Sequence, residues 1–247
     1  MEFALTVAIG IIILAFFCEY MDSTLGMGYG TTMTPLLLLL GFQPIEIVPA
    51  VLMSELVTGI LAGILHSREG NVDLSPKTLN MARIANSLRA NGFVVSFKSG
   101  IPRHLKVAML LVSCSFVGAV SAVFTSQMIS KFWQQMYIGV IVISMGIVIL
   151  VFLNKEFKFS YLKILFLGML ASFNKGLTGG GYGPLVVSGQ IISGVESKNA
   201  IGITSLVEGL TSLVGLCTYF LIAGNSIDWK LGIVISIGSI CSVPFSV

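Results

Sequence analysis

The chain has 247 residues, of which 55% are hydrophobic and only 10% are charged, and its formal net charge is +3. A soluble domain carries roughly 25% charged residues, so this composition excludes an ordinary soluble protein and indicates a chain that crosses a membrane several times. The small net charge gives no reason to expect a nucleic-acid partner.

Seven apolar segments are long enough to cross a bilayer, because a helical crossing needs about 20 residues. Two further apolar segments, 30–41 and 183–193, have only about half of that length, and each follows a glycine cluster. We therefore predict an all-α polytopic transmembrane helical bundle in which these two are glycine-broken or re-entrant half-helices. The seven long segments are 3–25, 45–66, 105–127, 132–153, 160–178, 199–223 and 229–247.

The first segment, 3–25, lacks the basic start and the small-residue cleavage site of a signal peptide, so we predict a retained helix. Positive charge gathers further on, since residues 66–106 and 154–163 hold ten of the 14 Lys and Arg residues. Basic loops stay on the cytoplasmic side. We expect loops 67–104 and 154–163 to face the cytoplasm in a multi-pass protein of the cell (inner) membrane. Residues 76–97 suit either an amphipathic surface helix or a solvated linker.

Two stretches of the chain align with each other without a gap at a constant offset of 153 residues. Each contains a glycine cluster that is followed by a glutamate inside an apolar helix. Interrupted hydrophobic segments at corresponding positions of two halves are the best sequence indicator of a transporter's binding site. The offset superposes Gly26 on Gly179, Gly28 on Gly181, Tyr29 on Tyr182, Gly30 on Gly183, Gly41 on Gly194, Glu55 on Glu208 and Thr58 on Thr211.

This repeat divides the chain into residues 1–153 and 154–247. The second part has one long segment fewer, so we expect its last helix to be missing from the sequence. If segments 30–41 and 183–193 dip in and return, each complete half has four crossings and the halves are parallel. If these two segments cross the membrane fully, each complete half has five crossings and the halves are inverted. About 12 helical residues reach roughly 18 Å, which favours re-entrant segments.

With these motifs the chain resembles the TauE/SafE family of sulfite and organosulfonate exporters, over nearly its whole length. Its long basic loop and its missing last helix depart from the family pattern. The resemblance implies transport of a small anion, with sulfite and related sulfur oxyanions as typical substrates. The residues that carry it are Gly26–Gly30, Thr34–Leu38, Gly41–Pro44 and Ala50–Gly59 in the first half, Gly70–Asp73 after it, and Gly179–Pro184, Glu196–Asn199 and Gly202–Ser205 in the second.

The glycine clusters suit an anion site, because a helix that breaks and restarts exposes N–H groups at the positive end of its dipole. Close packing of helices through small residues is the other explanation of such clusters. Neighbouring polar groups can add donors for an oxyanion. The predicted substrate-binding residues are Gly28, Tyr29, Gly30, Asn174, Lys175, Thr178, Gly181, Tyr182 and Gly183.

Glu55 and Glu208 lie deep within apolar helices, where an ionised and unpaired carboxylate costs at least about 2.5–3.5 kcal/mol. Their carboxyl groups suit proton coupling or gating. A structural hydrogen bond to a neighbouring helix is the alternative role. Asp22 and Lys175 hold equivalent positions in the two copies, so we expect an ion pair between them or contact of Lys175 with substrate. Glu19 is a second acid of this region or interfacial. The predicted coupling or gating residues are Glu55, Glu208, Asp22, Ser54, Thr58 and Thr211.

The remaining reactive residues indicate no chemistry. His66 and His104 are isolated at helix ends, so we expect them at the membrane interface and not in a metal site. Four cysteines lie far apart in apolar segments, so we expect packed thiols, and we expect no cofactor. No nucleophile with a base is evident, so we expect no enzyme.

We predict a secondary transporter, an exporter by resemblance, that works by alternating access. Its expected partners are the small anion and the lipid bilayer, and a homodimer is compatible with the sequence. An uncoupled anion channel and a membrane sensor or subunit without transport remain as alternatives.

Overall fold

The structure is a computed structural model that describes residues 5–73, 103–152, 160–224 and 227–247. Over these ranges it is all helical, which confirms the predicted fold class. Two of the helices are short, at 11 residues each: α2 (Tyr29–Leu39) and α8 (Tyr182–Ile192). The long helices lie within two residues of the predicted segments: α1 (Leu5–Leu25), α3 (Pro44–Arg68), α5 (Arg103–Met128), α6 (Lys131–Phe152), α7 (Tyr161–Thr178), α9 (Ser197–Ala223) and α10 (Trp229–Ser246).

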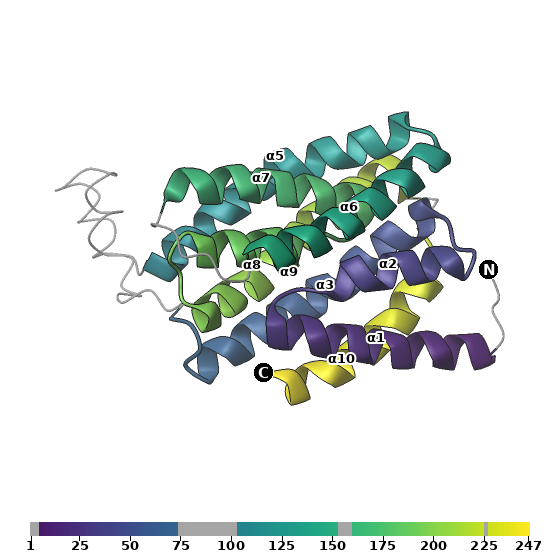
Figure 1. Ribbon diagram of the computed structural model, residues 1–247. Helices are drawn as coiled ribbons and strands as arrows, with labels where there is room; N and C mark the ends of the chain where they lie inside the picture. Colours follow the sequence, from purple (N-terminus) through teal and green to yellow (C-terminus); the bar gives the residue numbers. More distant parts are fainter. Residues whose placement is uncertain (1–4, 74–102, 153–159, 225–226) are drawn as a thin grey trace.

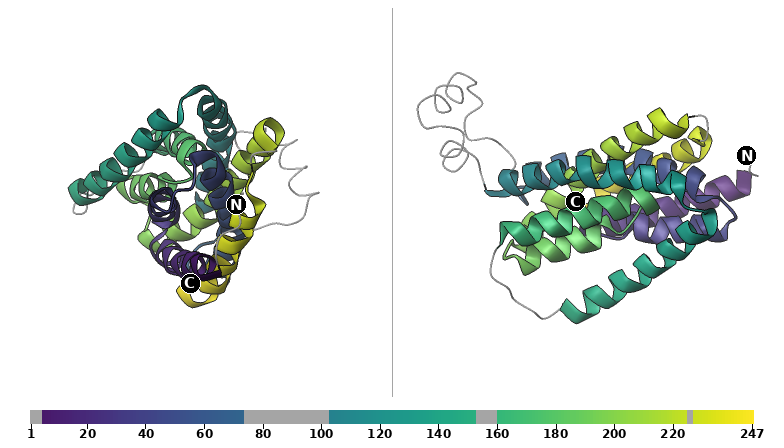
Figure 2. Two further views of the ribbon diagram at one scale, coloured as in Figure 1. Left: turned by 90° about the vertical axis from the view of Figure 1, so that its right-hand side faces the viewer. Right: turned by 90° about the horizontal axis from the view of Figure 1, so that it is seen from above.

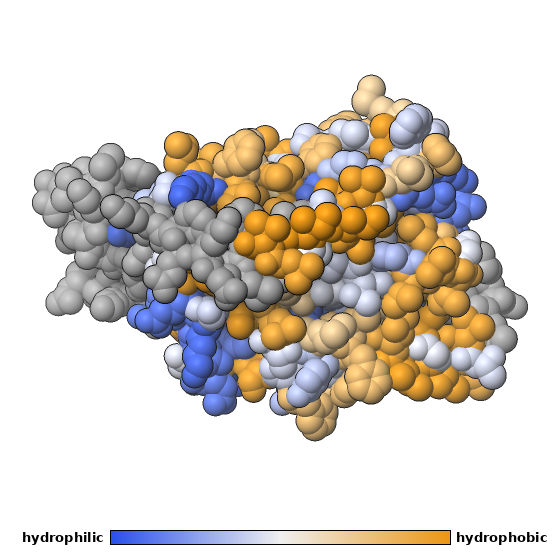
Figure 3. Space-filling model, in the orientation of Figure 1, coloured by the Kyte–Doolittle hydropathy of each residue, from blue (hydrophilic) through white to orange (hydrophobic). Residues whose placement is uncertain are grey.

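Five helices in the described ranges, α1, α3, α5, α9 and α10, are long and apolar enough to cross a membrane. Large apolar side chains also point outward from the bundle, as at Leu39 and Leu221, which are both 83% exposed. Figure 3 shows hydrophobic residues over much of one face, with hydrophilic residues gathered toward its ends. Such a surface suits lipid, so the molecule is an integral membrane protein.

The helices run between two ends of the bundle. At the first, which we call the basic end, α3 and α8 finish while α5 and α9 begin. Here Gly202 packs against His66, and a cavity of about 150 Å³ is bordered by residues of α5 and of the α8–α9 junction. At the opposite end α3 and α6 begin, and Lys131 donates a hydrogen bond to Gln43. The exposed Arg68 and Lys198 lie at the basic end and give it its name.

Two hairpins enter the bundle from opposite ends, and their turns contact each other (Figure 1). In the first, α1 comes in from the opposite end, the chain turns at Gly26–Gly28, and α2 returns toward the start of α3. In the second, α7 comes in from the basic end, turns at Gly179–Gly181, and is followed by α8. Both short segments therefore return, as the re-entrant prediction required.

The sequence left two arrangements of the halves open, parallel and inverted, and the direction of the two central helices bears on them. Pairs in contact between α3 and α9 run in opposite directions, from Leu52 with Gly215 through Gly59 with Gly209 to Gly63 with Leu206. The two central helices are thus antiparallel. This direction fits inverted rather than parallel halves, because α1 and α7 each form a hairpin with the short helix that follows instead of a complete crossing.

The offset of 153 residues recurs in the backbone. Helices α2 and α8 begin at Tyr29 and Tyr182, and α3 and α9 begin at Pro44 and Ser197. Three pairs of glycines with positive φ are separated by the same offset: Gly26 and Gly179, Gly28 and Gly181, and Gly41 and Gly194. Only glycine adopts these angles without strain, so the turns explain the glycine clusters. The division into two repeats stays a prediction.

Helix α6 diverges from the other helices along its length (Figure 2). Near its start Gln134 donates to the Leu177 carbonyl, whereas Ile143 and Leu150 further along are 66% and 72% exposed. The possible amphipathic helix 76–97 and most of loop 154–163 lie outside the described residues. Cys18 and Cys114 are packed, but Cys217 and Cys241 are exposed, which corrects the expectation of packed thiols.

Candidate functional site

The two glycine turns pack backbone against backbone at the centre of the bundle. A Cβ atom on Gly30 would lie 2.0 Å from the Gly179 carbonyl oxygen, and one on Gly183 would lie 2.5 Å from that of Gly26. No side chain fits between such surfaces. The packing explanation of the clusters therefore holds for these positions, while Gly28 and Gly181 have more room.

Lys175 is the one fully buried lysine or arginine in the described part of the chain. Its ammonium group pairs with Glu55 Oε2 from α3 and lies 2.6 Å from Glu208 Oε1 of α9. The two glutamates that the repeat singled out thus meet at one cation, although they lie on different helices. Lys175 also lies 6.0 Å from the centre of the Tyr182 ring, at the start of α8.

Small residues allow α7 to bury this lysine. Gly168 approaches Leu111 on α5, and Gly176 approaches Ala119 and Ala122 closely enough that a Cβ there would clash. Close helix approach through small residues is usual in membranes. The charge is consequently surrounded by protein on every side.

Two further acids, Glu19 and Asp22, belong to the same cluster. Both are buried on α1, and both interact electrostatically with Glu208. Ser23 donates to Glu19 Oε1 at 2.7 Å, which leaves the other Glu19 oxygen without a hydrogen bond. Glu19 is therefore not interfacial. We call Glu19, Asp22, Glu55, Glu208 and Lys175 the central cluster.

In the described structure Asp22 and Lys175 do not form the direct ion pair that was one of the two expectations for them. Asp22 Oδ1 instead accepts a hydrogen bond of 3.0 Å from the backbone N–H of Tyr29, the first residue of α2. Lys175, with its longer side chain, reaches the two glutamates. Sequence equivalence placed both residues correctly beside the turns but could not specify which partner each would choose.

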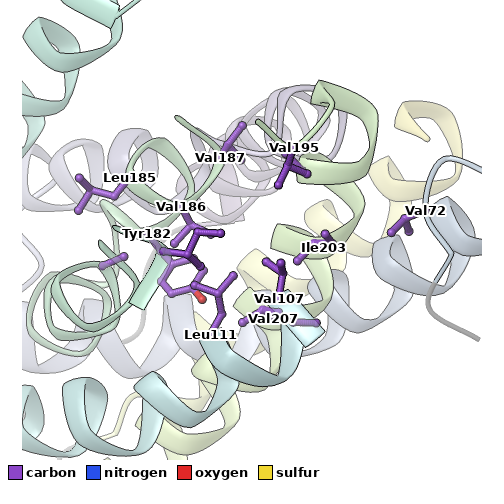
Figure 4. Packing of buried hydrophobic residues seen from close by; sticks show 14 residues of the cluster. Val72, Val107, Leu111, Tyr182, Leu185, Val186, Val187, Val195, Ile203 and Val207 are labelled. Atoms are coloured by element: carbon purple, nitrogen blue, oxygen red, sulfur yellow. The ribbon is translucent and has the colours of Figure 1, made fainter. Parts of the chain in front are cut away.

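The equivalent tyrosines are both fully buried but differ in their bonding. Tyr29 donates to Ser54 Oγ at 2.8 Å and accepts from Ser239 Oγ at 2.8 Å. The Tyr182 hydroxyl lies beside Ser115 and Thr211 without completing a hydrogen bond. Figure 4 shows its ring among buried apolar side chains that include Leu111 and Val186. Both tyrosines thus anchor half-helices to the helices around them.

Asn174 and Thr178 lie beside the second turn, and both are buried. Asn174 Oδ1 accepts from Tyr137 at 2.6 Å, while its amide nitrogen has no partner in the described structure. Thr178 Oγ1 accepts from the Gly180 N–H at 3.0 Å and donates to the Asn174 carbonyl at 2.8 Å. Thr178 therefore fixes the turn, and Asn174 retains a free donor group.

Thr58 and Thr211, predicted as coupling or gating residues, each donate a hydrogen bond to the backbone of their own helix. Thr58 Oγ1 donates to the Ser54 carbonyl at 3.2 Å, and Thr211 Oγ1 donates to the Val207 carbonyl at 2.8 Å. Threonine in a helix commonly bonds back to the preceding turn in this way. Each hydroxyl thus bonds a backbone carbonyl of its own helix rather than the glutamate of that helix.

His66 was expected at an interface, but it is buried and holds the first hairpin. Its Nε2 contacts the Ser23 carbonyl at 3.0 Å, while Asn71 contacts Nδ1. Tyr219 makes the equivalent contact in the second half, donating to the Gly176 carbonyl at 3.1 Å. The offset of 153 residues relates His66 to Tyr219 and Ser23 to Gly176, so it could have revealed this pair.

The central cluster holds four carboxyl groups and one ammonium group. All four acids cannot be ionised together in a water-poor bundle without strong repulsion, and one lysine neutralises only one of them. Proton binding to a carboxyl group would relieve this repulsion and loosen its hold on Lys175. The cluster can therefore bind or release a proton at the same point where Lys175 loses or gains a carboxylate partner.

Comparison with known proteins identifies the family of the chain. A family model described as "Sulfite exporter TauE/SafE" matches residues 11–85 and 81–247, which include both hairpins and the central cluster. The chain belongs to the TauE/SafE sulfite exporter family. This TauE/SafE protein is thus a membrane transporter of the sulfite-exporter type.

A curated relative of this TauE/SafE protein is the "Probable membrane transporter protein YtnM" of Bacillus subtilis (strain 168). The two are 25% identical over 244 residues, which cover 92% of this chain and 69% of the relative. No solved structure matches the chain.

Proposed function

We propose that the protein exports a small anion, a sulfite or organosulfonate-type sulfur oxyanion, by alternating access coupled to protons. The observation that carries this proposal is the sharing of the buried Lys175 of α7 by Glu55 and Glu208, which lie on the antiparallel helices α3 and α9. The family's description as sulfite exporters supports the substrate class. No Walker-type phosphate loop occurs in the sequence, so a secondary mechanism is favoured.

Lys175 is the group that attracts the anion. With Glu55 and Glu208 ionised, its charge is satisfied internally and an incoming anion meets a net negative cluster. Protonation of the glutamates removes this competition and lets the ammonium group turn to the anion. Anion and proton would therefore bind together, and release of one would favour release of the other.

The hairpins supply the movement. They enter from opposite ends and meet at the centre, so rocking of one half against the other can open the site to each side in turn. In this structure Lys175 is fully buried, which corresponds to a closed site. A closed centre favours a carrier over an open pore.

The direct test is flux in liposomes. Sulfite, thiosulfate, sulfoacetate, taurine and sulfate should be compared with and without an imposed pH gradient. We expect uptake of at least one sulfur oxyanion, trans-stimulation by the same anion inside, and acceleration by a gradient. Flux without trans-stimulation and without pH dependence would identify an uncoupled channel instead.

Replacing either glutamate should separate binding from coupling. Glu55→Gln and Glu208→Gln each keep the shape of the side chain and leave Lys175 one carboxylate partner. We expect both variants to fold and to exchange anion at equal pH, but to lose the response to a pH gradient because glutamine cannot release a proton.

The control is Glu69→Gln, which removes an exposed carboxyl group just after α3. It should respond to the gradient as the unchanged protein does. If both cluster variants also respond normally, the glutamates are structural and protons are not the coupling ion.

A second experiment tests which side of the membrane the basic end faces. We expect this end to face the cytoplasm, following the charge of its loops. In a background with Cys217 and Cys241 replaced by alanine, Ser130→Cys should react with an impermeant thiol reagent in intact cells. Glu69→Cys should react only after the cells are permeabilised. The reverse pattern would place the basic end outside.

A further inference from the structure

The two short helices begin in equivalent ways but have different surroundings. Helix α2 starts after Gly28 and α8 after Gly181, and both glycines have positive φ. The first N–H groups of any helix lack partners within that helix and carry part of its positive dipole. Each start is therefore a place where negative charge is stabilised.

At the start of α2 this place is already occupied. The carboxylate of Asp22 accepts the hydrogen bond from the Tyr29 N–H at 3.0 Å. The neighbouring residue, Met21, offers no polar group and is 40% exposed. An anion from outside would have to displace a carboxylate that belongs to the chain, so this start is a poor site for substrate.

At the start of α8 the equivalent residues have the opposite character. Lys175 replaces Asp22, and Asn174 replaces Met21, at the offset of 153 residues. The N-cap residue of this helix is Gly181, which provides no side-chain cap. A negative group has thus been exchanged for a cation, and an apolar side chain for a hydrogen-bond donor.

Asn174 provides independent evidence of a ligand. Its side chain is fully buried, and its amide nitrogen has no hydrogen-bond partner in the described structure. This nitrogen lies 3.8 Å from the Cβ position of Gly181, the residue that precedes α8. A buried donor without a partner is costly, so such a group is expected to serve a bound acceptor.

We propose that the transported anion binds at the N-terminus of α8, between the Asn174 amide and the Lys175 ammonium group, at the position equivalent to the Asp22 carboxylate on α2. This inference rests on the proposed function and specifies its site. Of the two predicted glycine sites, the one at the start of α8 then binds substrate, and the one at the start of α2 is occupied by the Asp22 carboxylate. Asp22 shows which chemical group the site accepts, namely a compact oxyanion.

Two substitutions at one residue test this assignment. Asn174→Met installs the residue of the first half and removes the amide donor. Asn174→Asp keeps the size of the side chain and places a carboxylate beside the α8 start, as Asp22 does beside α2. We expect sulfite to bind roughly tenfold or more weakly to the methionine variant and not measurably to the aspartate variant.

Binding of radiolabelled sulfite to purified protein should be measured at several pH values, together with thermal unfolding. The aspartate variant should stay folded, because the helix start stabilises its carboxylate. The matched control is Met21→Asn, which adds an amide at the equivalent position of α1 and should leave sulfite affinity unchanged.

The possible outcomes separate the two proposals. Normal sulfite affinity in Asn174→Asp, or a loss of affinity in Met21→Asn equal to that in Asn174→Met, would overturn the α8 site while leaving the transport function in place. If the unchanged protein binds none of the sulfur oxyanions, the proposed function itself fails. Loss of binding at Asn174 alone, with folding retained, supports the site.

Discussion

Lys175→Met is expected to abolish anion transport and to destabilise the protein strongly. The substitution leaves Glu55 and Glu208 buried without their shared cation. Removing one partner of a buried ion pair typically costs about 3–5 kcal/mol, because the remaining charge is uncompensated. Thermal unfolding in detergent and sulfite flux in liposomes measure the two effects.

A rescue variant distinguishes loss of charge balance from loss of substrate contact. Adding Glu55→Gln and Glu208→Gln to Lys175→Met removes the uncompensated carboxylates, so thermal stability should recover while transport stays absent. Lys230→Met, at an exposed lysine near the start of α10, is the control and should behave like the unchanged protein. Normal transport in Lys175→Met would remove the lysine from the mechanism.

Gly30→Ala is expected to force the two hairpins apart. The added methyl group would lie 2.0 Å from the Gly179 carbonyl oxygen and 2.7 Å from Gly180 Cα, and both are backbone atoms that cannot rotate away. Overpacking of this kind costs about 1–3 kcal/mol or more. We expect a lowered unfolding temperature and loss of flux, and the same from Gly180→Ala.

Gly139→Ala is the matched control, because no atom lies within 4 Å of the Cβ position of Gly139 on α6. Alanine favours a helix over glycine by roughly 1 kcal/mol, so this control should be neutral or slightly stabilising. If Gly30→Ala also unfolds and transports normally, the close contact of the turns is not needed for function.

The sequence indicated the helices and the turns well, because both depend on local physics. Apolar length predicted every long helix, and only glycine tolerates the angles found at Gly26 and Gly179. The offset also identified Glu55 and Glu208 as a pair before any contact was known.

The hydrogen-bond and ion-pair partners of the site residues could not be predicted, because they depend on the direction in which each helix runs. The sequence left the relative orientation of the halves open, because it does not show whether α1 is a full crossing or one arm of a hairpin. His66 was overlooked because a lone histidine near a helix end usually lies at the interface, whereas here the returning hairpin covers it.

The central cluster also has a consequence for the order of assembly. Glu19, Asp22 and Glu55 are synthesised and inserted well before Lys175, and Glu208 follows last. During that interval the early carboxyl groups have no internal cation and are costly in lipid unless they are protonated or close to water. The newly inserted first half is thus an incomplete folding intermediate, and the arrival of α7 and then α9 completes it.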